Sequence, residues 1–276
     1  MPYFTIPTQV RYPQITLDDL LSMDLNKELY LGPIGKVGDT RTYYQETVPA
    51  KLKSESKKAA RAYALAAFVS KHEALYNVPR HRLYHSFSVP KRNGKLRQID
   101  APLPPLMEAL RELKTIFETE FSASHHTSAF AYAKGRCAVS AVQRHQQNDS
   151  RWFLKLDCSN FFGSTTKAFT LRMLSVIWPF SEIIEDSSTR PILDRALDLC
   201  FLDDVLPQGT PISPMLTNII MIPFDHAVFN SLRNFGGHHL VYTRYADDLT
   251  ISGRYDFKWT DVAQFIESMF RKFDAP

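Results

Sequence analysis

Two adjacent carboxylates, Asp247 and Asp248, stand near the C-terminal end of the sequence. They separate two short stretches rich in strand-forming residues, 240–245 and 249–252. The connection lacks the Gly or Asn that tight hairpin turns favour, and neighbouring carboxylates repel each other unless a cation lies between them. The pattern fits an ordinary solvated turn, and it also fits a metal site.

A third carboxylate, Asp157, ends another stretch with strand character. Residues 152–157 alternate in a way that predicts a strand with Trp152, Leu154 and Leu156 buried on one face. Three hard oxygen donors on neighbouring strands are what two Mg²⁺ ions, or Mn²⁺ as a substitute, need for in-line phosphoryl transfer. In such a site one ion lowers the pKa of an attacking 3′-hydroxyl and the other holds a triphosphate.

A loop rich in proline forms the second chemical feature. Residues 206–214 read Leu-Pro-Gln-Gly-Thr-Pro-Ile-Ser-Pro, and Ser213-Pro214 predicts an N-cap followed by the first residue of a helix. Gly209 lets another backbone or a ligand approach closely, and the Gln208 side chain can hydrogen-bond a nucleotide. A stiff loop that binds no ligand is the alternative.

The third feature is a basic segment. Six Lys or Arg residues stand against one acid between Arg80 and Asp100. Asn93-Gly94 predicts the tip of a hairpin whose strands are 85–89 and 96–99. Its charges suit a triphosphate or a template backbone, although a basic hairpin is more often simply exposed.

Composition limits the class of protein. The 276 residues carry 33 Lys and Arg against 29 Asp and Glu, a net charge of +4, and 44% hydrophobic content excludes wholesale disorder. Residues 51–61 are basic and suit a phosphate-bearing partner or, equally, a solvated helix face, whereas 182–204 hold seven acids. No apolar run reaches the roughly 18 residues of a membrane helix. Three cysteines without paired spacing and the lack of a secretory signal lead us to expect a cytoplasmic protein with no membrane partner.

Apolar periodicity places the remaining helices. Residues 55–76 are rich in Ala, with apolar positions at helical spacing. Another helix opens at Pro104-Pro105, and five apolar residues share one of its faces: Leu106, Leu110, Leu113, Phe117 and Phe121. Helices mixed with antiparallel strands predict an α+β fold.

The order of these motifs resembles the reverse transcriptases, in particular the bacterial branch that holds retron, group II intron and phage-defence enzymes. The resemblance covers roughly residues 84–253 and is closest to retron and defence enzymes at 242–252. It implies a right-hand polymerase fold: an N-terminal helical extension at 1–78, fingers at 79–151, and a palm with an antiparallel sheet at 152–276. The palm would contain a finger-like insertion around 164–206 and stop before the thumb.

The resemblance also implies a role for particular residues. Asp157, Asp247 and Asp248 would be catalytic and bind the metal ions, with the Cys158 carbonyl as a further ligand. Phe162 would exclude a 2′-hydroxyl, and one of Phe161 and Phe162 would belong to the core. The other implied contacts are Gln208 and Gly209 under the incoming nucleotide, Lys91 and Arg97 on its triphosphate, and Tyr245, Lys95 and Asn218 at the primer or template.

The implied function is RNA-directed DNA synthesis from dNTPs, with a noncoding RNA template, a DNA primer or product, and a role in antiphage defence. A protein partner or an oligomer could supply the thumb. Two alternatives stay open: a template-independent or protein-primed DNA polymerase of the abortive-infection kind, and an RNA-binding scaffold similar to the maturases. Residues 141–145 keep only the His of the Asn-Ala-x-x-His element of retron enzymes, which favours another defence group. We expect His145 to be a structural hydrogen-bonding residue.

Overall fold

The computed structural model describes residues 48–90, 94 and 96–275, so Lys91 and Lys95 lie outside the described residues. The described chain divides into two compact units. Residues 48–125 and 160–223 form the first, here the helical unit; residues 126–159 and 224–274 form the second, the sheet unit. Residues 126–151 thus group with the strands at 152–157 and 240–253, and residues 160–223 group with the hairpin at 84–102.

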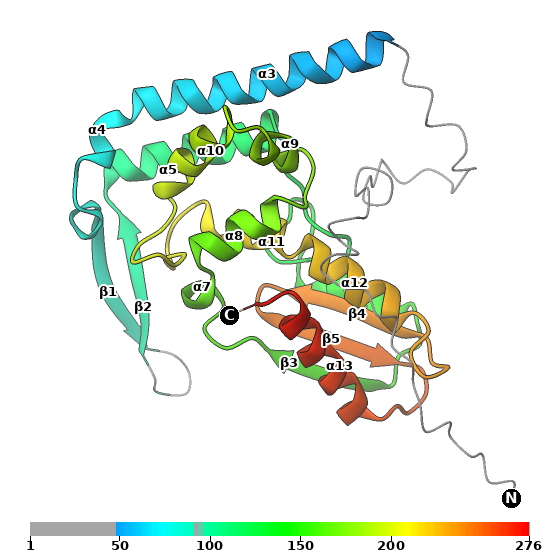
Figure 1. Cartoon of the computed structure of the whole chain (residues 1–276). Coiled ribbons are helices and arrows are strands. Elements are labelled where there is room, and N and C mark those ends of the chain that lie inside the picture. The colour runs from blue at the N-terminus through cyan, green and yellow to red at the C-terminus, as the bar shows by residue number, and fades with distance from the viewer. Residues whose placement is uncertain (1–47, 91–93, 95, 276) are drawn as a thin grey trace, which may run out of the picture. The chain divides into compact units, whose positions relative to one another are not determined.

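The helical unit joins a hairpin to a set of helices. Its elements are α3 (Val48–Lys71), α4 (Glu73–Tyr76), the 3₁₀ helix η2 (Arg80–Leu83), β1 (Tyr84–Pro90), β2 (Leu96–Pro102), α5 (Pro104–Thr119), α7 (Phe161–Ser164), α8 (Lys167–Leu174), α9 (Phe180–Glu185), α10 (Arg190–Asp198) and α11 (Ser213–Ile220). Figure 1 shows α3 lying across α5 and α10. The helix expected at 55–76 and the one expected from Pro104 are confirmed, the first with a break at His72.

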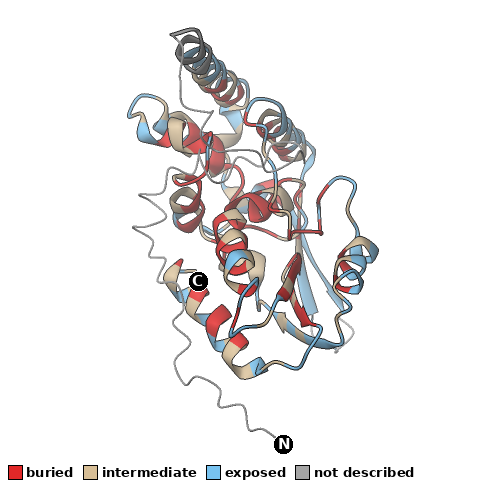
Figure 2. Ribbon diagram, turned by 90° about the vertical axis from the view of Figure 1, so that its right-hand side faces the viewer, coloured by how far each residue is buried: buried red, intermediate tan, exposed pale blue. Residues whose placement is uncertain are grey.

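The core of the helical unit forms where apolar helix faces meet. The predicted stripe of α5 is buried at Leu106, Leu110, Leu113 and Phe117. The Phe117 ring lies 5.2 Å from that of Phe180 on α9, with an edge-to-face geometry that adds to the burial energy of about 1.5–3 kcal/mol per side chain. Buried residues, in red in Figure 2, follow the inward faces of the helices.

Acids of α9 and the segment after it neutralise part of the basic cluster on α3. The Lys58 ammonium lies 2.7 Å from the Asp186 carboxylate, and the Arg61 guanidinium lies 3.0 Å from Glu182. Arg61 is only 4% exposed. Lys58 and Arg61 therefore stabilise the packing of α3, a role that differs from both alternatives left open for the cluster at 51–61, the phosphate partner and the solvated helix face.

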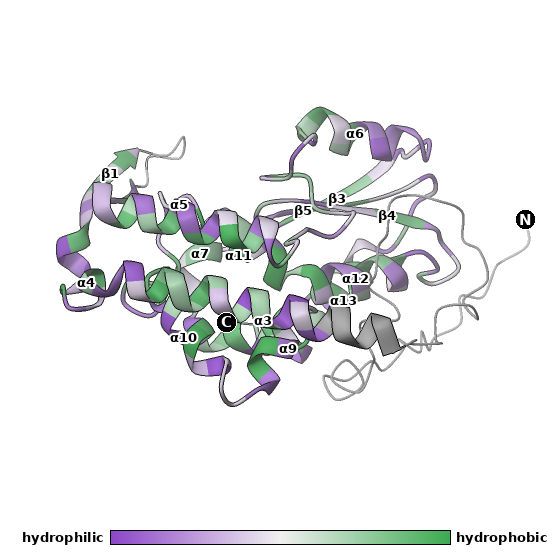
Figure 3. Cartoon of the chain, turned by 90° about the horizontal axis from the view of Figure 1, so that it is seen from above, coloured by the Kyte–Doolittle hydropathy of each residue, from purple (hydrophilic) through white to green (hydrophobic). Residues whose placement is uncertain are grey.

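The sheet unit is built on three antiparallel strands. Its elements are α6 (Ala138–Gln146), β3 (Trp152–Asp157), α12 (Ile222–Leu232, from residue 224 on), β4 (Leu240–Tyr245), β5 (Asp248–Gly253) and α13 (Trp259–Lys272). The strand order is β3-β5-β4, which confirms the predicted antiparallel sheet. Figure 3 shows α6 on one side of the strands and α12 and α13 on the other. None of the described helices is long and apolar enough to span a membrane.

Burial on β3 differs from the sequence prediction. Trp152 is 49% exposed and Phe153 60%, so the expected buried face of this strand does not form at its start. The reason is the strand order, since β3 is an edge strand with one paired neighbour. Burial instead concentrates on β4 and β5, where Tyr242, Leu249 and Ile251 are at most 1% exposed.

Candidate active site

The three carboxylates predicted to act together meet at one end of the sheet. Asp157 and Asp248 are directly opposite each other in the β3–β5 pairing, which places their Cα atoms about 4.5–5.5 Å apart. Asp247 belongs to the turn between β4 and β5, and its backbone carbonyl accepts a hydrogen bond of 3.0 Å from the Cys158 amide. The strand pairing therefore places the backbone of Asp157 next to Asp248 and to the turn that holds Asp247, although Asp157 lies far away in the sequence.

A lysine compensates part of the charge of this group. Lys155 precedes Asp157 by two residues on β3, and its ammonium lies 3.0 Å from Asp248 Oδ1. Asp157 is exposed, while Asp247 and Asp248 are half-buried. The site therefore faces solvent, and a positive charge already lies against one of its carboxylates.

Carboxylate oxygens are the hard donors that Mg²⁺ and Mn²⁺ prefer, so the donor chemistry fits a divalent cation. In the part of the chain that the structure describes, no three His, Cys, Asp or Glu side chains are gathered closely enough to hold an ion. The Lys155 ammonium contacts Asp248 from one side and would compete with a cation for that oxygen.

The turn that carries Asp247 has an unusual backbone conformation. Ala246 has a φ of 59°, in the left-handed region that costs a residue other than Gly about 1–2 kcal/mol. The buried side chain of Arg244 donates a hydrogen bond of 3.1 Å to the Ala246 carbonyl. This contact holds the strained turn in place next to Asp247 and Asp248.

Arg244 is itself fixed by a buried carboxylate on α12. Its Nη2 lies 2.8 Å from Asp225 Oδ2, and the Tyr242 hydroxyl donates to Asp225 Oδ1 at 2.7 Å. Arg244 is 1% exposed and Asp225 0%. Burial alone would lower the pKa of Arg244, but the charge of Asp225 raises it above its ordinary value. Sequence analysis missed this group, although a lone acid within the apolar run 219–229 was a usable signal.

A second buried polar group holds the opposite face of the sheet. His145 of α6 lies 2.6 Å from the Ser252 hydroxyl on β5 and 2.8 Å from the Thr243 hydroxyl on β4. Burial, followed by the nearby charge of Arg144, lowers the pKa of His145 to about 4, so the imidazole is neutral at pH 7. The prediction that His145 is a structural hydrogen-bonding residue is confirmed.

The predicted basic hairpin forms in the helical unit. β1 and β2 pair antiparallel with Val89 opposite Arg97, which is exposed. Gln208 packs against the hairpin through its carbonyl, which accepts a hydrogen bond of 2.7 Å from the Asp100 amide. Gly209 has a φ of 118°, and a Cβ there would lie 3.0 Å from the Asp100 carbonyl oxygen. The glycine is therefore required by close backbone packing within this unit.

The other predicted site residues differ in how far they are exposed. Tyr245 is 43% exposed, as a primer contact requires. Asn218 is 4% exposed, because α11 buries it, and it offers almost no surface for a primer or template. Phe161 and Phe162 are both half-buried, so the expectation that one of them belongs to the core is wrong.

The helix start expected at Ser213-Pro214 is also displaced. Ile212 occupies the N-cap position and Ser213 is the first helical residue. The Ser213 hydroxyl donates to the Pro207 carbonyl at 2.9 Å, so it closes the preceding loop instead of capping the helix.

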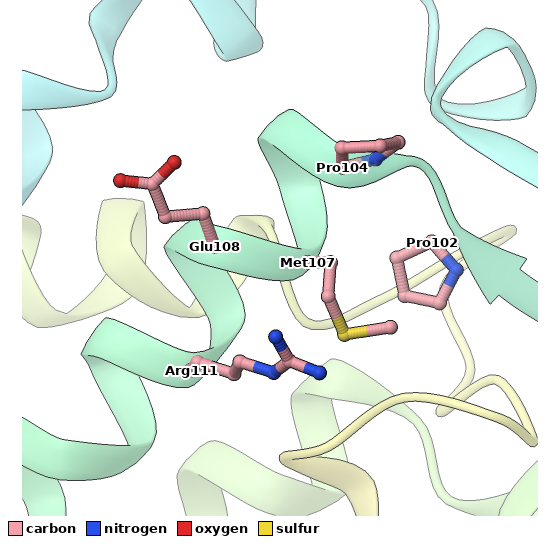
Figure 4. A pocket seen from close by; sticks show the side chains of 5 residues that line it. All are labelled: Pro102, Pro104, Met107, Glu108 and Arg111. Carbon is pink, nitrogen blue, oxygen red and sulfur yellow. The ribbon is translucent and has the colours of Figure 1, made fainter.

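A pocket of about 540 Å³ lies in the helical unit where β2 leads into α5. Figure 4 shows its lining side chains: Pro102, Pro104, Met107, Glu108 and Arg111. None of them is a predicted site residue.

An antiparallel sheet that presents carboxylates at one end and is covered by helices on its two faces defines the palm of a right-hand polymerase. The chain belongs to the reverse transcriptase family: the pattern described as "Reverse transcriptase (RNA-dependent DNA polymerase)" matches residues 89–274. The resemblance seen in the sequence motifs is thereby confirmed.

Individual relatives include retron reverse transcriptases. The chain is 30% identical over 207 residues to "Retron Mx65 reverse transcriptase" of Myxococcus xanthus, covering 70% of this chain and 46% of that protein. It is 29% identical over 177 residues to "Retron Ec83 reverse transcriptase" of Escherichia coli, covering 61% and 52%. The chain thus spans about half the length of these curated relatives. A solved structure of apo telomerase from Candida tropicalis, truncated from the C-terminal domain, matches with a TM-score of 0.43 and 11% identity, covering 70% of this chain and 47% of that one.

Proposed function

We propose that this chain carries the polymerase centre of an RNA-directed DNA polymerase. The observation that carries the proposal is the pairing of Asp157 with Asp248 across β3 and β5, beside the turn that holds Asp247. Divalent cations bound there would lower the pKa of a primer 3′-hydroxyl and neutralise the leaving pyrophosphate. The residues themselves would hold the ions, and the buried Arg244 would keep the turn in one conformation.

Nucleotide contacts are assigned by the resemblance. Arg97, with Lys91, would bind the triphosphate of the incoming dNTP, and Gln208 and Gly209 would lie under that nucleotide. The exposed Arg97 side chain supports the assignment. We extend the proposal to a noncoding RNA template and a role in antiphage defence, as the resemblance to the retron branch implies.

Removal of the catalytic charges is the direct test. Asp247→Asn combined with Asp248→Asn should lower nucleotide incorporation by about 10³-fold or more, since neutral amides bind divalent cations poorly. Folding should be retained, because neither Asp247 nor Asp248 is fully buried and the ion-pair partner of Asp248, Lys155, is exposed. Asp256→Asn, which removes an exposed acid from the same unit, is the matched control. Incorporation at the wild-type rate by the double variant would refute the proposal.

Sugar selection tests the assignment of Phe162. If its ring lies where a 2′-hydroxyl would otherwise fit, Phe162→Ala should raise incorporation of ribonucleotides relative to deoxyribonucleotides by about tenfold. Phe161→Ala is the control, because both rings are half-buried and lie 5.7 Å apart. An unchanged ratio in Phe162→Ala, measured with single nucleotides on one primer–template, would remove the residue from the site.

A further inference from the structure

A short segment of the sheet unit extends the sheet beyond β4. The Arg244 amide donates to the Ser128 carbonyl at 2.7 Å, and the Phe130 amide donates to the Arg244 carbonyl at 2.8 Å. The carbonyls of Thr127 and Ala129 take no part in this pairing with β4. They lie in the outermost segment of the sheet, where free backbone groups need other partners.

Two arginine side chains supply those partners. Arg136 Nη1 donates to the Thr127 carbonyl at 2.6 Å and to the Ala129 carbonyl at 2.8 Å. Arg144 Nη1 donates to the same Thr127 carbonyl at 2.7 Å. Two guanidinium groups therefore meet on one carbonyl oxygen, although like charges repel each other.

Among the described residues, no carboxylate forms an ion pair with either arginine. Burial lowers the pKa of Arg136, and burial together with the charge of Arg136 lowers that of Arg144. The two charges are thus partly withdrawn from water without a neutralising acid. This differs from Arg61 and Arg244, the buried arginines of the described chain that each have a carboxylate partner.

A third arginine joins the pair. The guanidinium groups of Arg144 and Arg233 lie 5.6 Å and 5.8 Å from the centre of the same ring, that of Phe229 on α12. Arg233 is exposed, and it forms no ion pair with the described residues. The Phe229 ring therefore links Arg233 to Arg144, and the Thr127 carbonyl links Arg144 to Arg136, so three guanidinium groups are connected within the sheet unit.

We propose that Arg136, Arg144 and Arg233 form a binding site for the phosphate groups of an RNA backbone. Arg136 and Arg144 use only Nη1 in their contacts with the carbonyls, so each keeps Nε and Nη2 donors without a partner in the described structure. Such donors match the geometry of a phosphate, which would also offset the repulsion between the arginines. The inference rests on the proposed function for the identity of the nucleic acid.

RNA binding by the 276-residue chain tests the site without any catalytic readout. The probe is a fluorescent RNA hairpin with a single-stranded end, titrated by anisotropy at several salt concentrations. Arg233→Gln should weaken binding by about threefold to tenfold and reduce the slope of log affinity against log salt by about one. Arg144→Gln should act in the same direction, whereas Arg144→Lys, which keeps the charge, should recover part of the affinity. Arg271→Gln, which removes an exposed arginine paired with Glu267, should leave affinity and slope unchanged.

The outcomes separate this inference from the proposed function. If the wild-type chain neither binds the hairpin nor extends a primer on RNA, the proposed function fails. If the wild type binds, but Arg233→Gln and Arg144→Gln keep its affinity and salt slope, only the phosphate site is refuted, and the arginines serve to cap the sheet edge. Polyglutamate provides a last control: competition as strong as that of unlabelled RNA at equal charge would assign the surface to an acidic protein and overturn the inference.

Discussion

Two antiparallel hairpins carry predicted site residues, and they are anchored in opposite ways. The β4–β5 hairpin holds Asp247 and Asp248 and is fixed by buried polar groups on both of its faces. Arg244 and Asp225 hold one face, and His145 holds the other through the hydroxyl groups of β4 and β5. Each group is almost fully withdrawn from water, so each stabilises one arrangement of the sheet strongly.

The β1–β2 hairpin has its contacts at the base. Every residue of β1 after Tyr84 is exposed. At the base, the Asp100 carboxylate accepts hydrogen bonds from Ser86 at 2.7 Å and Gln98 at 3.1 Å, and the Asp100 amide reaches the loop at Gln208. The strand that carries Arg97 is therefore open to solvent and to a ligand.

The contrast follows from the chemistry proposed for each hairpin. Carboxylates that share metal ions must keep fixed distances, and buried hydrogen bonds with defined partners provide such positions. A cationic side chain that binds a triphosphate needs an accessible surface, and exposure of Arg97 provides it. Changes to the anchors of β4–β5 should therefore affect stability and catalysis together. Changes at the base of β1–β2 should mainly affect binding of the nucleotide.

The largest effect is expected at the buried ion pair. Arg244→Met leaves the Asp225 carboxylate buried without a charge partner and should lower the free energy of unfolding by about 3–5 kcal/mol. Adding Asp225→Leu and Tyr242→Phe removes the buried polar groups that have lost their partner, and should restore most of that stability. Primer extension should stay low in the triple variant, since nothing then holds the Ala246 carbonyl. Urea denaturation and extension rates measure the two effects separately. A triple variant that is stable and fully active would show that the pair does not position the turn.

These anchors mark where prediction from the sequence ends. Alternating residues and motif order were sufficient for both hairpins, for the strand at 152–157 and for the meeting of Asp157 with Asp248. The contact of Arg244 with Asp225 joins a strand to a helix, and that of Lys58 with Asp186 spans 128 residues. No local period encodes which distant side chains become partners. The exposure of Trp152 was missed for a similar reason, because strand order decides which strand lies at the edge.

An intermediate effect is expected from pH. In the folded protein His145 stays neutral down to a pKa of about 4, whereas in the unfolded chain it takes up a proton near pH 6.5. Protons therefore favour unfolding as the pH falls from about 6.5 to 4. The free energy of unfolding should fall by about 2–3 kcal/mol because of His145 alone. Burial also lowers the pKa of His126, which is 2% exposed, to about 4. This residue should therefore add a similar loss of stability in acid.

Denaturation curves between pH 7 and 4.5 provide the measurement. His145→Gln should be less stable than wild type at pH 7, but its stability should fall less steeply with acid, because one of the two imidazoles is gone. Equal slopes for wild type and variant would mean that His145 is not held neutral by its contacts with Thr243 and Ser252.

The smallest effect on stability is expected where the Gln208 loop meets the other hairpin. Gly209→Ala places a Cβ 3.0 Å from the Asp100 carbonyl oxygen and from Ile99 Cγ2, in a backbone conformation that other residues rarely adopt. The strain should cost about 1–3 kcal/mol, and the loop should move away from β2. We expect the KM for dNTP to rise more than kcat falls, because the loop would lie under the nucleotide while the carboxylates keep their own anchors.

Gly237→Ala is the matched control, since Gly237 has a φ of 82° with no atom near the added Cβ. It should lose about 1 kcal/mol of stability and keep the wild-type KM. If Gly209→Ala instead lowers kcat at an unchanged KM, the loop and the catalytic turn are coupled, and the division of roles between the two hairpins does not hold.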